Sequence, residues 1–192
     1  MSKGPEAGSG CQANAHQAYN SGILIDPQGN IVLHHRQINV VRNAFDPDSC
    51  QKILNKAQCN YSVGTLLGIT TAETSFGKTA ILVCADAYTY PPAQVLQELK
   101  KLQPDLVVVF WGITASQECE CGAEGFNAAD YAAKAAAYLE TAVVVGANAV
   151  GERHYGRFLP SVYCGTSGYA FPDGKKIEAD CSNEELVLFR IE

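Results

Sequence analysis

The chain has 192 residues, of which 47% are hydrophobic and 18% are charged, and its formal net charge is -6 at pH 7. This length suits one globular domain, and the composition is that of an ordinary soluble protein. The negative charge, with no Lys/Arg-rich run, argues against nucleic acid or an anionic membrane as a partner, because both favour clustered positive charge.

The chain begins with MSKGPEAGSG, which is rich in Gly and Ser and has no apolar segment like that of a signal peptide. We therefore predict a flexible leader over residues 1–18 and a single domain over residues 19–192. The most apolar long window, residues 128–150, contains charged side chains that disfavour a membrane span. No membrane association is predicted, and the expected location is the cytoplasm.

The number of cysteines is high for a chain of this length. An even number is compatible with disulfide pairing in a secreted protein. The lack of an export signal favours reduced thiols instead, as does a length that permits a core without cross-links. The eight are Cys11, Cys50, Cys59, Cys84, Cys119, Cys121, Cys164 and Cys181.

The first elements are predicted to be strands. Two β-rich runs at residues 19–26 and 31–37 flank the turn PQGN and predict a β-hairpin. Residues 43–62 are polar and interrupted by breakers, which indicates a loop or a short helix. Residues 64–71 and 76–84 predict two further strands.

Helical and strand patterns then alternate. Residues 93–103, AQVLQELKKLQ, have apolar side chains at helical spacing, and residues 127–141 combine an Asn cap with many alanines, so both segments predict helices. The continuous apolar runs at residues 105–111 and 143–149 predict strands that are covered on both faces.

The last two predicted strands are residues 162–171 and 185–191, on either side of the turn PDGKK. Strands that alternate with helices along a chain indicate an α/β layered domain. In such a domain the helices cover the faces of a central sheet.

Five segments together resemble one family. They are, in chain order, YNSGILIDPQGNIVLHHRQINVV, FGKTAILVCAD, LQELKKLQPDLVVVFWG, VVVGANAVG and YCGTSGYAFPDGKK. Their order and spacing resemble the nitrilase superfamily of carbon–nitrogen hydrolases, over residues 19–191. The resemblance implies an α/β fold, the nitrilase-like four-layer αββα sandwich, which is expected here to be missing its first strand and helix.

The resemblance also implies a Glu-Lys-Cys triad, in which a cysteine thiolate attacks a nitrile or amide carbon. Such chemistry requires a soft nucleophile, a base, and a donor or positive charge at the developing oxyanion. Cys84 in ILVCAD falls at the nucleophile position, and the backbone N–H of Ala85 falls at that of an oxyanion donor. Gln37 in RQIN occupies the lysine position. The glutamate has no counterpart, since Glu6 lies in the leader.

Residues near these positions leave alternatives open. Free cysteines are often buried, so Cys84 also fits a core thiol. His34 and His35 alternate across a strand, which allows either a Cys–His dyad or one exposed and one packed histidine. Arg36 is expected on the face opposite the lysine position. Asp86 is expected to anchor the turn by hydrogen bonds rather than to act as a base.

Two aromatic residues are candidates for substrate binding. Trp111 and Tyr88 follow strand ends on the same sheet edge as Cys84, if the strands are parallel. Both side chains fit the hydrophobic core equally well. His154, in the loop GERHYGRF, is expected to face solvent.

No metal or cofactor site is predicted. Cys119 and Cys121 form a close pair, but zinc sites need further ligands at recognisable spacing, and Cys50 with Cys59 does not supply it. The sequence has no G-x-G-x-x-G motif and no Walker loop.

Two functions are compatible with this pattern. One is a carbon–nitrogen hydrolase of amidase or nitrilase type that acts on a small amide or nitrile through a Cys84 thioester. Its activity is expected to be impaired, because Gln37 replaces the lysine and the glutamate is absent. The alternative is a non-catalytic nitrilase-fold binding or assembly protein. A bare apolar sheet edge favours association, so a homo-oligomer is predicted.

Overall fold

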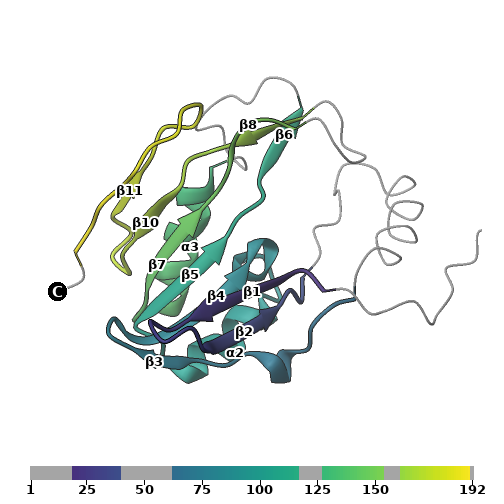
Figure 1. The fold of residues 1–192 in the computed structure, drawn as a ribbon, viewed down its shortest axis with the longest axis vertical. Helices are drawn as coiled ribbons and strands as arrows, with labels where there is room; N and C mark the ends of the chain where they lie inside the picture. The colour runs from purple at the N-terminus through teal and green to yellow at the C-terminus, as the bar shows by residue number, and fades with distance from the viewer. Residues whose placement is uncertain (1–18, 40–61, 117–126, 154–160, 191–192) are drawn as a thin grey trace, which may run out of the picture.

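The computed structural model describes residues 19–39, 62–116, 127–153 and 161–190, and Figure 1 shows their arrangement. Some of the residues considered above lie outside these ranges. They are residues 1–18 with Glu6 and Cys11, residues 43–61 with Cys50 and Cys59, the pair Cys119 and Cys121, and His154.

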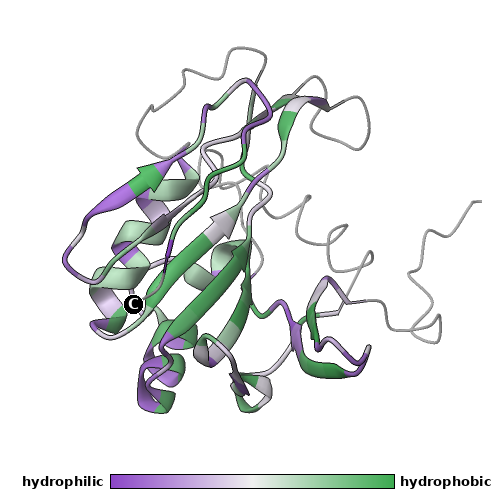
Figure 2. Cartoon of the chain, turned by 60° about the vertical axis from the view of Figure 1, so that its left-hand side comes forward, coloured by the Kyte–Doolittle hydropathy of each residue, from purple (hydrophilic) through white to green (hydrophobic). Residues whose placement is uncertain are grey.

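The centre of the fold is a six-stranded mixed sheet with the strand order β11-β10-β7-β5-β4-β3. The three central strands are parallel, and the three outer strands pair antiparallel. The central strands consist largely of β-branched and other apolar residues, and Figure 2 shows much of their length in the green of hydrophobic residues. The strands are β3 (Ala72–Thr74), β4 (Gly77–Val83), β5 (Leu106–Phe110), β7 (Val143–Ala147), β10 (Gly168–Ala170) and β11 (Lys176–Glu178).

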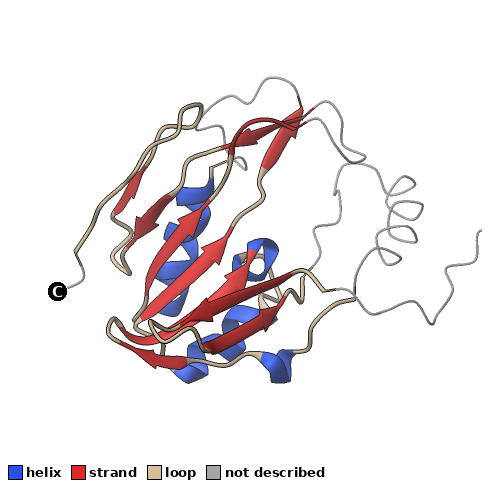
Figure 3. Cartoon of the chain, in the orientation of Figure 1, coloured by secondary structure: helices blue, strands red, loops and turns tan. Residues whose placement is uncertain are grey.

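Two α-helices, α2 (Gln94–Leu102) and α3 (Ala128–Leu139), cover one face of this sheet (Figure 3). The Asn127 side chain caps α3 by accepting from the Asp130 N–H, as the sequence predicts. The small alanine side chains of α3 allow it to approach the sheet closely. The buried core between helices and sheet includes Leu82, Val107, Val109, Val144, Leu96, Leu99 and Leu139.

The hairpin of β1 (Ser21–Ile25) and β2 (Ile31–Arg36) lies across the opposite face of the sheet (Figure 1). Gly22 is required at this contact, because a Cβ there would lie 2.7 Å from Ile81 and 2.8 Å from Phe110. The hairpin therefore packs directly on β4 and β5, and the end of β2 reaches the carboxyl edge of the parallel strands.

A third, three-stranded sheet extends beyond the carboxyl ends of β5 and β7 (Figure 1). Its order is β6-β9-β8, and both pairings are antiparallel. Neither β6 nor β8 was expected from the sequence. The strands are β6 (Thr114–Ser116), β8 (Val150–Arg153) and β9 (Ser161–Cys164).

Three strand predictions are wrong. Residues 64–71 contain a short 3-10 helix, η1 (Leu66–Gly68), rather than a strand. The strand predicted over residues 162–171 is divided into β9 and β10, because Gly165 and Thr166 between them adopt positive φ. Residues 185–190 form no strand. This segment instead docks through Phe189, whose ring stacks on Tyr169 at a centroid distance of 4.2 Å.

The described residues thus form a mixed α/β fold with helices on one face of a sheet and a strand hairpin on the other. Within those ranges no α-helix covers the outer face of the hairpin. None of the helices described here is long and apolar enough to cross a membrane.

Candidate functional site

Cys84 lies at the point where β4 ends and a 3-10 turn, η2 (Cys84–Ala87), begins. Its φ angle is +49°, in the left-handed region that residues other than glycine rarely adopt. Such outliers persist where the surrounding structure enforces them, and they concentrate at functional sites. The sharp turn places the half-buried Cys84 side chain at the carboxyl edge of the parallel strands.

Hydrogen bonds to Asp86 connect the end of the hairpin to this turn. Its carboxylate is fully buried and accepts from His35 Nε2 at 2.7 Å. It also accepts from the backbone N–H groups of Ile38 at 3.1 Å and Asn39 at 2.6 Å. The Asn39 side chain donates to the Ala85 carbonyl at 3.2 Å. The prediction that Asp86 anchors the turn is confirmed.

His35 and Arg36 follow the predicted alternation along β2. His35 is buried on Asp86, whereas His34 is exposed, so the strand has one packed and one exposed histidine. Because His35 Nε2 is bonded to Asp86, the geometry gives no support to a Cys–His dyad. Arg36 is exposed on the other face, and its guanidinium lies 4.1 Å from the centroid of the Tyr19 ring.

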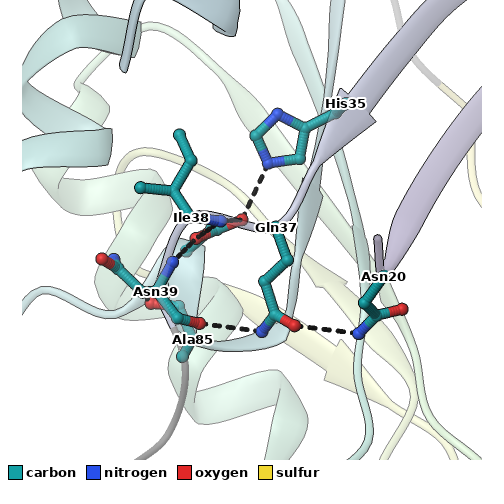
Figure 4. Close-up of polar contacts among 7 residues, drawn as sticks. Asn20, His35, Gln37, Ile38, Asn39 and Ala85 are labelled. Atoms are coloured by element: carbon teal, nitrogen blue, oxygen red, sulfur yellow. Dashed lines mark hydrogen bonds and ion pairs between the residues drawn. The ribbon is translucent and has the colours of Figure 1, made fainter. Parts of the chain in front are cut away.

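Gln37 is buried, and its side-chain amide is held at both ends (Figure 4). Asn20 Nδ2 donates to Gln37 Oε1 at 2.8 Å, and Gln37 Nε2 donates to the Asn39 carbonyl at 2.9 Å. Asn39 also bonds Ala85, so the network connects Gln37 to the residue that follows Cys84. A neutral amide in this position supplies hydrogen bonds but no charge.

The environment of Cys84 favours the protonated thiol. Burial, the largest influence, raises the pKa of the thiol above its usual value, and the nearby Asp86 carboxylate acts in the same direction. The backbone groups of Gly112 and Ala85 and the Tyr88 hydroxyl donate toward the sulfur and lower the pKa in part. Among the described residues, no lysine or arginine is one of the main influences on the pKa of this thiol.

An aromatic cluster lies beside Cys84. Tyr88 stacks on Tyr131 at a centroid distance of 4.5 Å and on Trp111 at 6.1 Å. The Tyr90 and Tyr131 hydroxyls are 3.4 Å apart. Burial raises the pKa of Tyr88 well above its usual range, which keeps its hydroxyl a hydrogen-bond donor at neutral pH. The cluster forms an apolar, uncharged wall next to the sulfur.

Trp111 is almost completely buried, and its Nε1–H has no hydrogen-bond partner among the described residues. The indole lies directly over Gly146, where a Cβ would be closer than contact distance to Nε1. The structure therefore brings both sequence candidates, Trp111 and Tyr88, to the Cys84 edge, and both also contact the core.

Sequence reasoning missed three residues of the site: Asn20, Asn39 and Tyr131. Asn39 stands within the segment RQIN, which was already considered for its glutamine. Asn20 directly precedes the first hairpin strand, and pairing of the two strands brings it next to Gln37. Tyr131 carried no signal beyond its place on an alanine-rich helix.

The described cysteines are not all reduced. Cys84 is the free cysteine of the described ranges, whereas Cys164 and Cys181 are disulfide-bonded. The prediction of reduced thiols is wrong for these two. Among the residues that the structure describes, no cluster of His, Cys, Asp and Glu could hold a metal ion.

The chain is similar to known proteins in its three-dimensional structure. No protein-family model matches the chain, and no curated protein matches it in sequence. A glutamine-dependent NAD+ synthetase from Acinetobacter baumannii superimposes with a TM-score of 0.63 at 18% identity. The match covers 88% of this chain and 27% of the synthetase.

An amidase from Nesterenkonia sp. AN1, in a structure that shows acrylamide added to its active-site cysteine, superimposes with a TM-score of 0.58 at 15% identity. The match covers 84% of this chain and 53% of the amidase. The NitN amidase from the same organism gives a TM-score of 0.55. The chain thus spans about half the length of the amidases that it matches.

Proposed function

We propose that this chain, whose fold is nitrilase-like as its sequence predicts, is a carbon–nitrogen hydrolase of amidase or nitrilase type with strongly reduced catalysis. The observation that carries the proposal is the geometry of Cys84. It occupies a left-handed position at the end of a parallel strand, and the backbone groups of Ala85 and Gly112 donate toward its sulfur. Substrates would be small amides or nitriles.

The reaction would proceed through a thioester at Cys84. The sulfur adds to the carbonyl carbon of an amide or to the carbon of a nitrile, and the negative charge that forms on the amide oxygen or the nitrile nitrogen needs hydrogen-bond donors. The N–H of Ala85, one of the backbone donors near the sulfur, is suited to that task. For an amide, the C–N bond then breaks as the nitrogen takes up a proton, and water releases the acid from the thioester.

Two of the groups that this reaction requires, an oxyanion donor and a proton-transfer group, are weak among the described residues. Gln37 offers a neutral donor where a charged one would stabilise the oxyanion, and loss of one strong donor typically reduces the rate about 100- to 1000-fold. Asp86, the carboxylate beside the thiol, already accepts bonds from His35, Ile38 and Asn39. It is therefore poorly placed to move a proton to or from the substrate.

The alternative is a non-catalytic nitrilase-fold protein that serves as a binding protein or as an assembly protein. The observation in its favour is the environment of the Cys84 thiol, because burial and the nearby Asp86 carboxylate both raise its pKa. An unactivated thiol is a poor nucleophile at neutral pH.

One pair of measurements separates these functions. Alkylation of Cys84 by iodoacetamide or acrylamide is followed against pH by peptide mass spectrometry, which distinguishes it from other cysteines. Ammonia release is measured with a panel of small amides and nitriles. We expect labelling with a midpoint above that of an ordinary thiol, and slow turnover that is lost in Cys84→Ala.

Two outcomes would decide against the proposal. Complete absence of ammonia release, with native folding intact, would favour the non-catalytic alternative. Turnover that persists in Cys84→Ala would mean that Cys84 is not the nucleophile.

A further inference from the structure

A second candidate site lies on the outer side of the hairpin, away from Cys84. It is a surface hollow of about 240 Å³, bounded by the end of β2 and the segment that leads to η1. Its lining includes Tyr19, His34, Arg36, Val63 and Thr65. A cavity needs roughly 10–15 Å³ by the same measure to hold one water molecule, so the hollow can admit a small polyatomic ligand.

The chemistry of the lining favours an anion. Arg36 carries a positive charge, and no carboxylate of the described residues lies within ion-pair distance of it. His34 is exposed beside it. The Thr65 side chain makes no capping hydrogen bond to η1, which leaves its hydroxyl available as a donor. Donors and positive charge gather here on a chain whose net charge is -6.

The arginine is held in place before any ligand binds. Its guanidinium lies over the Tyr19 ring at 4.1 Å, an arrangement in which the ring face attracts the cation. This contact involves the ring face of Tyr19, and the guanidinium keeps N–H groups to bond a ligand. Those N–H groups match two oxygens of a carboxylate or phosphate. Less side-chain freedom is lost on binding when the group is already ordered.

The hollow is separate from the Cys84 environment. Arg36 and His34 are exposed on the outer side of β2, whereas His35 and Gln37 are buried on its inner side. A backbone hydrogen bond connects the hollow to the buried side of β2: the Gly64 N–H donates to the Gln37 carbonyl at 2.7 Å. A ligand in the hollow would therefore contact the segment that supports Gln37 without touching the thiol.

We propose that this hollow is a binding site for a small oxyanion, a carboxylate or a phosphate group, held by the Arg36 guanidinium with His34 and Thr65. The two ligand classes share the paired oxygens that the arginine recognises. Val63, which lines the hollow and is 52% exposed, offers an apolar contact that a short-chain carboxylate would use and inorganic phosphate would not.

The test is a titration of the full chain, isotope-labelled for NMR, with inorganic phosphate and with butyrate. Chloride controls for the effect of negative charge alone, and 1-butanol controls for the effect of the alkyl chain of butyrate alone. We expect saturable shifts of the Gly64 and Gly68 amides with either oxyanion and none with the controls. Tighter binding of butyrate identifies the ligand class of the hollow as carboxylates, and tighter binding of phosphate identifies it as phosphate groups.

Substitutions locate the site. Arg36→Gln should weaken binding about tenfold or more, since hydrogen bonds to a charged group contribute about 1.5–3 kcal/mol. Arg36→Lys keeps the charge without the paired donors and should bind at an intermediate level. Arg190→Gln, at an exposed arginine outside the hollow, should bind like the native chain. Unchanged binding in a folded Arg36→Gln, or no shift at Gly64 and Gly68, would overturn the proposal.

Discussion

At the scale of single residues, the reactivity of Cys84 depends on a balance of opposing influences. Burial and the Asp86 carboxylate favour the thiol, whereas the Tyr88 hydroxyl and two backbone groups favour the thiolate. Gln37 is neutral, so it adds no charge that would favour the thiol or the thiolate. The same position could therefore become more or less nucleophilic through changes of single groups around the sulfur.

Tyr88→Phe should raise the pKa of Cys84 further, because it removes a donor that favours the thiolate. Labelling by iodoacetamide at pH 8 should become severalfold slower, as measured by peptide mass spectrometry. Tyr90→Phe is the matched control, since the Tyr90 hydroxyl contacts Tyr131. Equal or faster labelling in Tyr88→Phe would show that this hydroxyl does not act on the sulfur.

Gln37→Lys should lower the pKa of Cys84, because an ammonium group near the sulfur favours the thiolate. Ammonia release should not increase to that of an efficient amidase, because Asp86, the carboxylate near Cys84, already accepts bonds from His35, Ile38 and Asn39. Gln37→Met, which is neutral and of similar length, controls for the loss of the bonds to Asn20 and Asn39. Efficient turnover in Gln37→Lys would reveal a substitute for the glutamate.

At the scale of secondary-structure elements, buried contacts between distant segments build the site. A hydrogen bond between His35 and Asp86 connects β2 to η2, although these two residues are 51 positions apart in sequence. Neighbouring parallel strands, β4 and β5, bring Trp111 beside Tyr88. The position of Cys84 thus depends on both the hairpin and the central sheet.

Asp86→Ala should destabilise the domain by about 3–5 kcal/mol, because it leaves a buried histidine and two backbone N–H groups without their acceptor. Urea denaturation followed by circular dichroism measures this. Asp173→Ala removes a carboxylate whose contacts are exposed and should change stability by no more than about 0.5 kcal/mol. Similar stabilities of the two variants would contradict the anchoring role.

Gly146→Ala should cost about 1–3 kcal/mol, because the added methyl group overlaps the Trp111 indole and forces it to move. The near-ultraviolet circular dichroism of the indole should change with it. Gly112→Ala is a suitable comparison, since a Cβ at Gly112 meets no atom within 4 Å. Equal stability of the two variants would mean that the indole adjusts without cost.

At the scale of the whole molecule, the hairpin leaves large apolar side chains exposed. Ile23 and Ile25 on β1 are 44% and 53% exposed, and Ile31 and Val32 on β2 are 61% and 39% exposed. Exposed apolar patches of this kind promote association. The predicted homo-oligomer stays a prediction, and this hairpin face is the surface on which we expect the contact.

Replacing both Ile23 and Ile25 by Ser should shift the chain toward the monomer, because it reduces the apolar area that association would bury. Sedimentation velocity over a range of micromolar concentrations measures the change. Leu186→Ser, at a residue that is 81% exposed elsewhere on the surface, should leave association unchanged. A native chain that is monomeric throughout would contradict the prediction.

Local pattern was sufficient to predict much of the fold. The hairpin, β4, β5, β7, α2 and α3 lie where periodicity, caps and turn residues placed them, because those signals act within a few residues. The alternation along β2 correctly separated Arg36 from the buried side of the strand. The five segments between residues 19 and 191 that suggested the family also predicted an α/β fold, and the described residues form one that is similar to the folds of the two amidases.

Only the tertiary structure decided how the segments meet. The bond between His35 and Asp86 and the fixing of Gln37 by Asn20 and Asn39 join residues that no local pattern relates. The apolar segment at residues 185–190 could have paired as a strand, but Phe189 docks on Tyr169 instead. In each case the outcome depends on which partner lies within reach after folding, and that is a property of the packed chain rather than of a short segment.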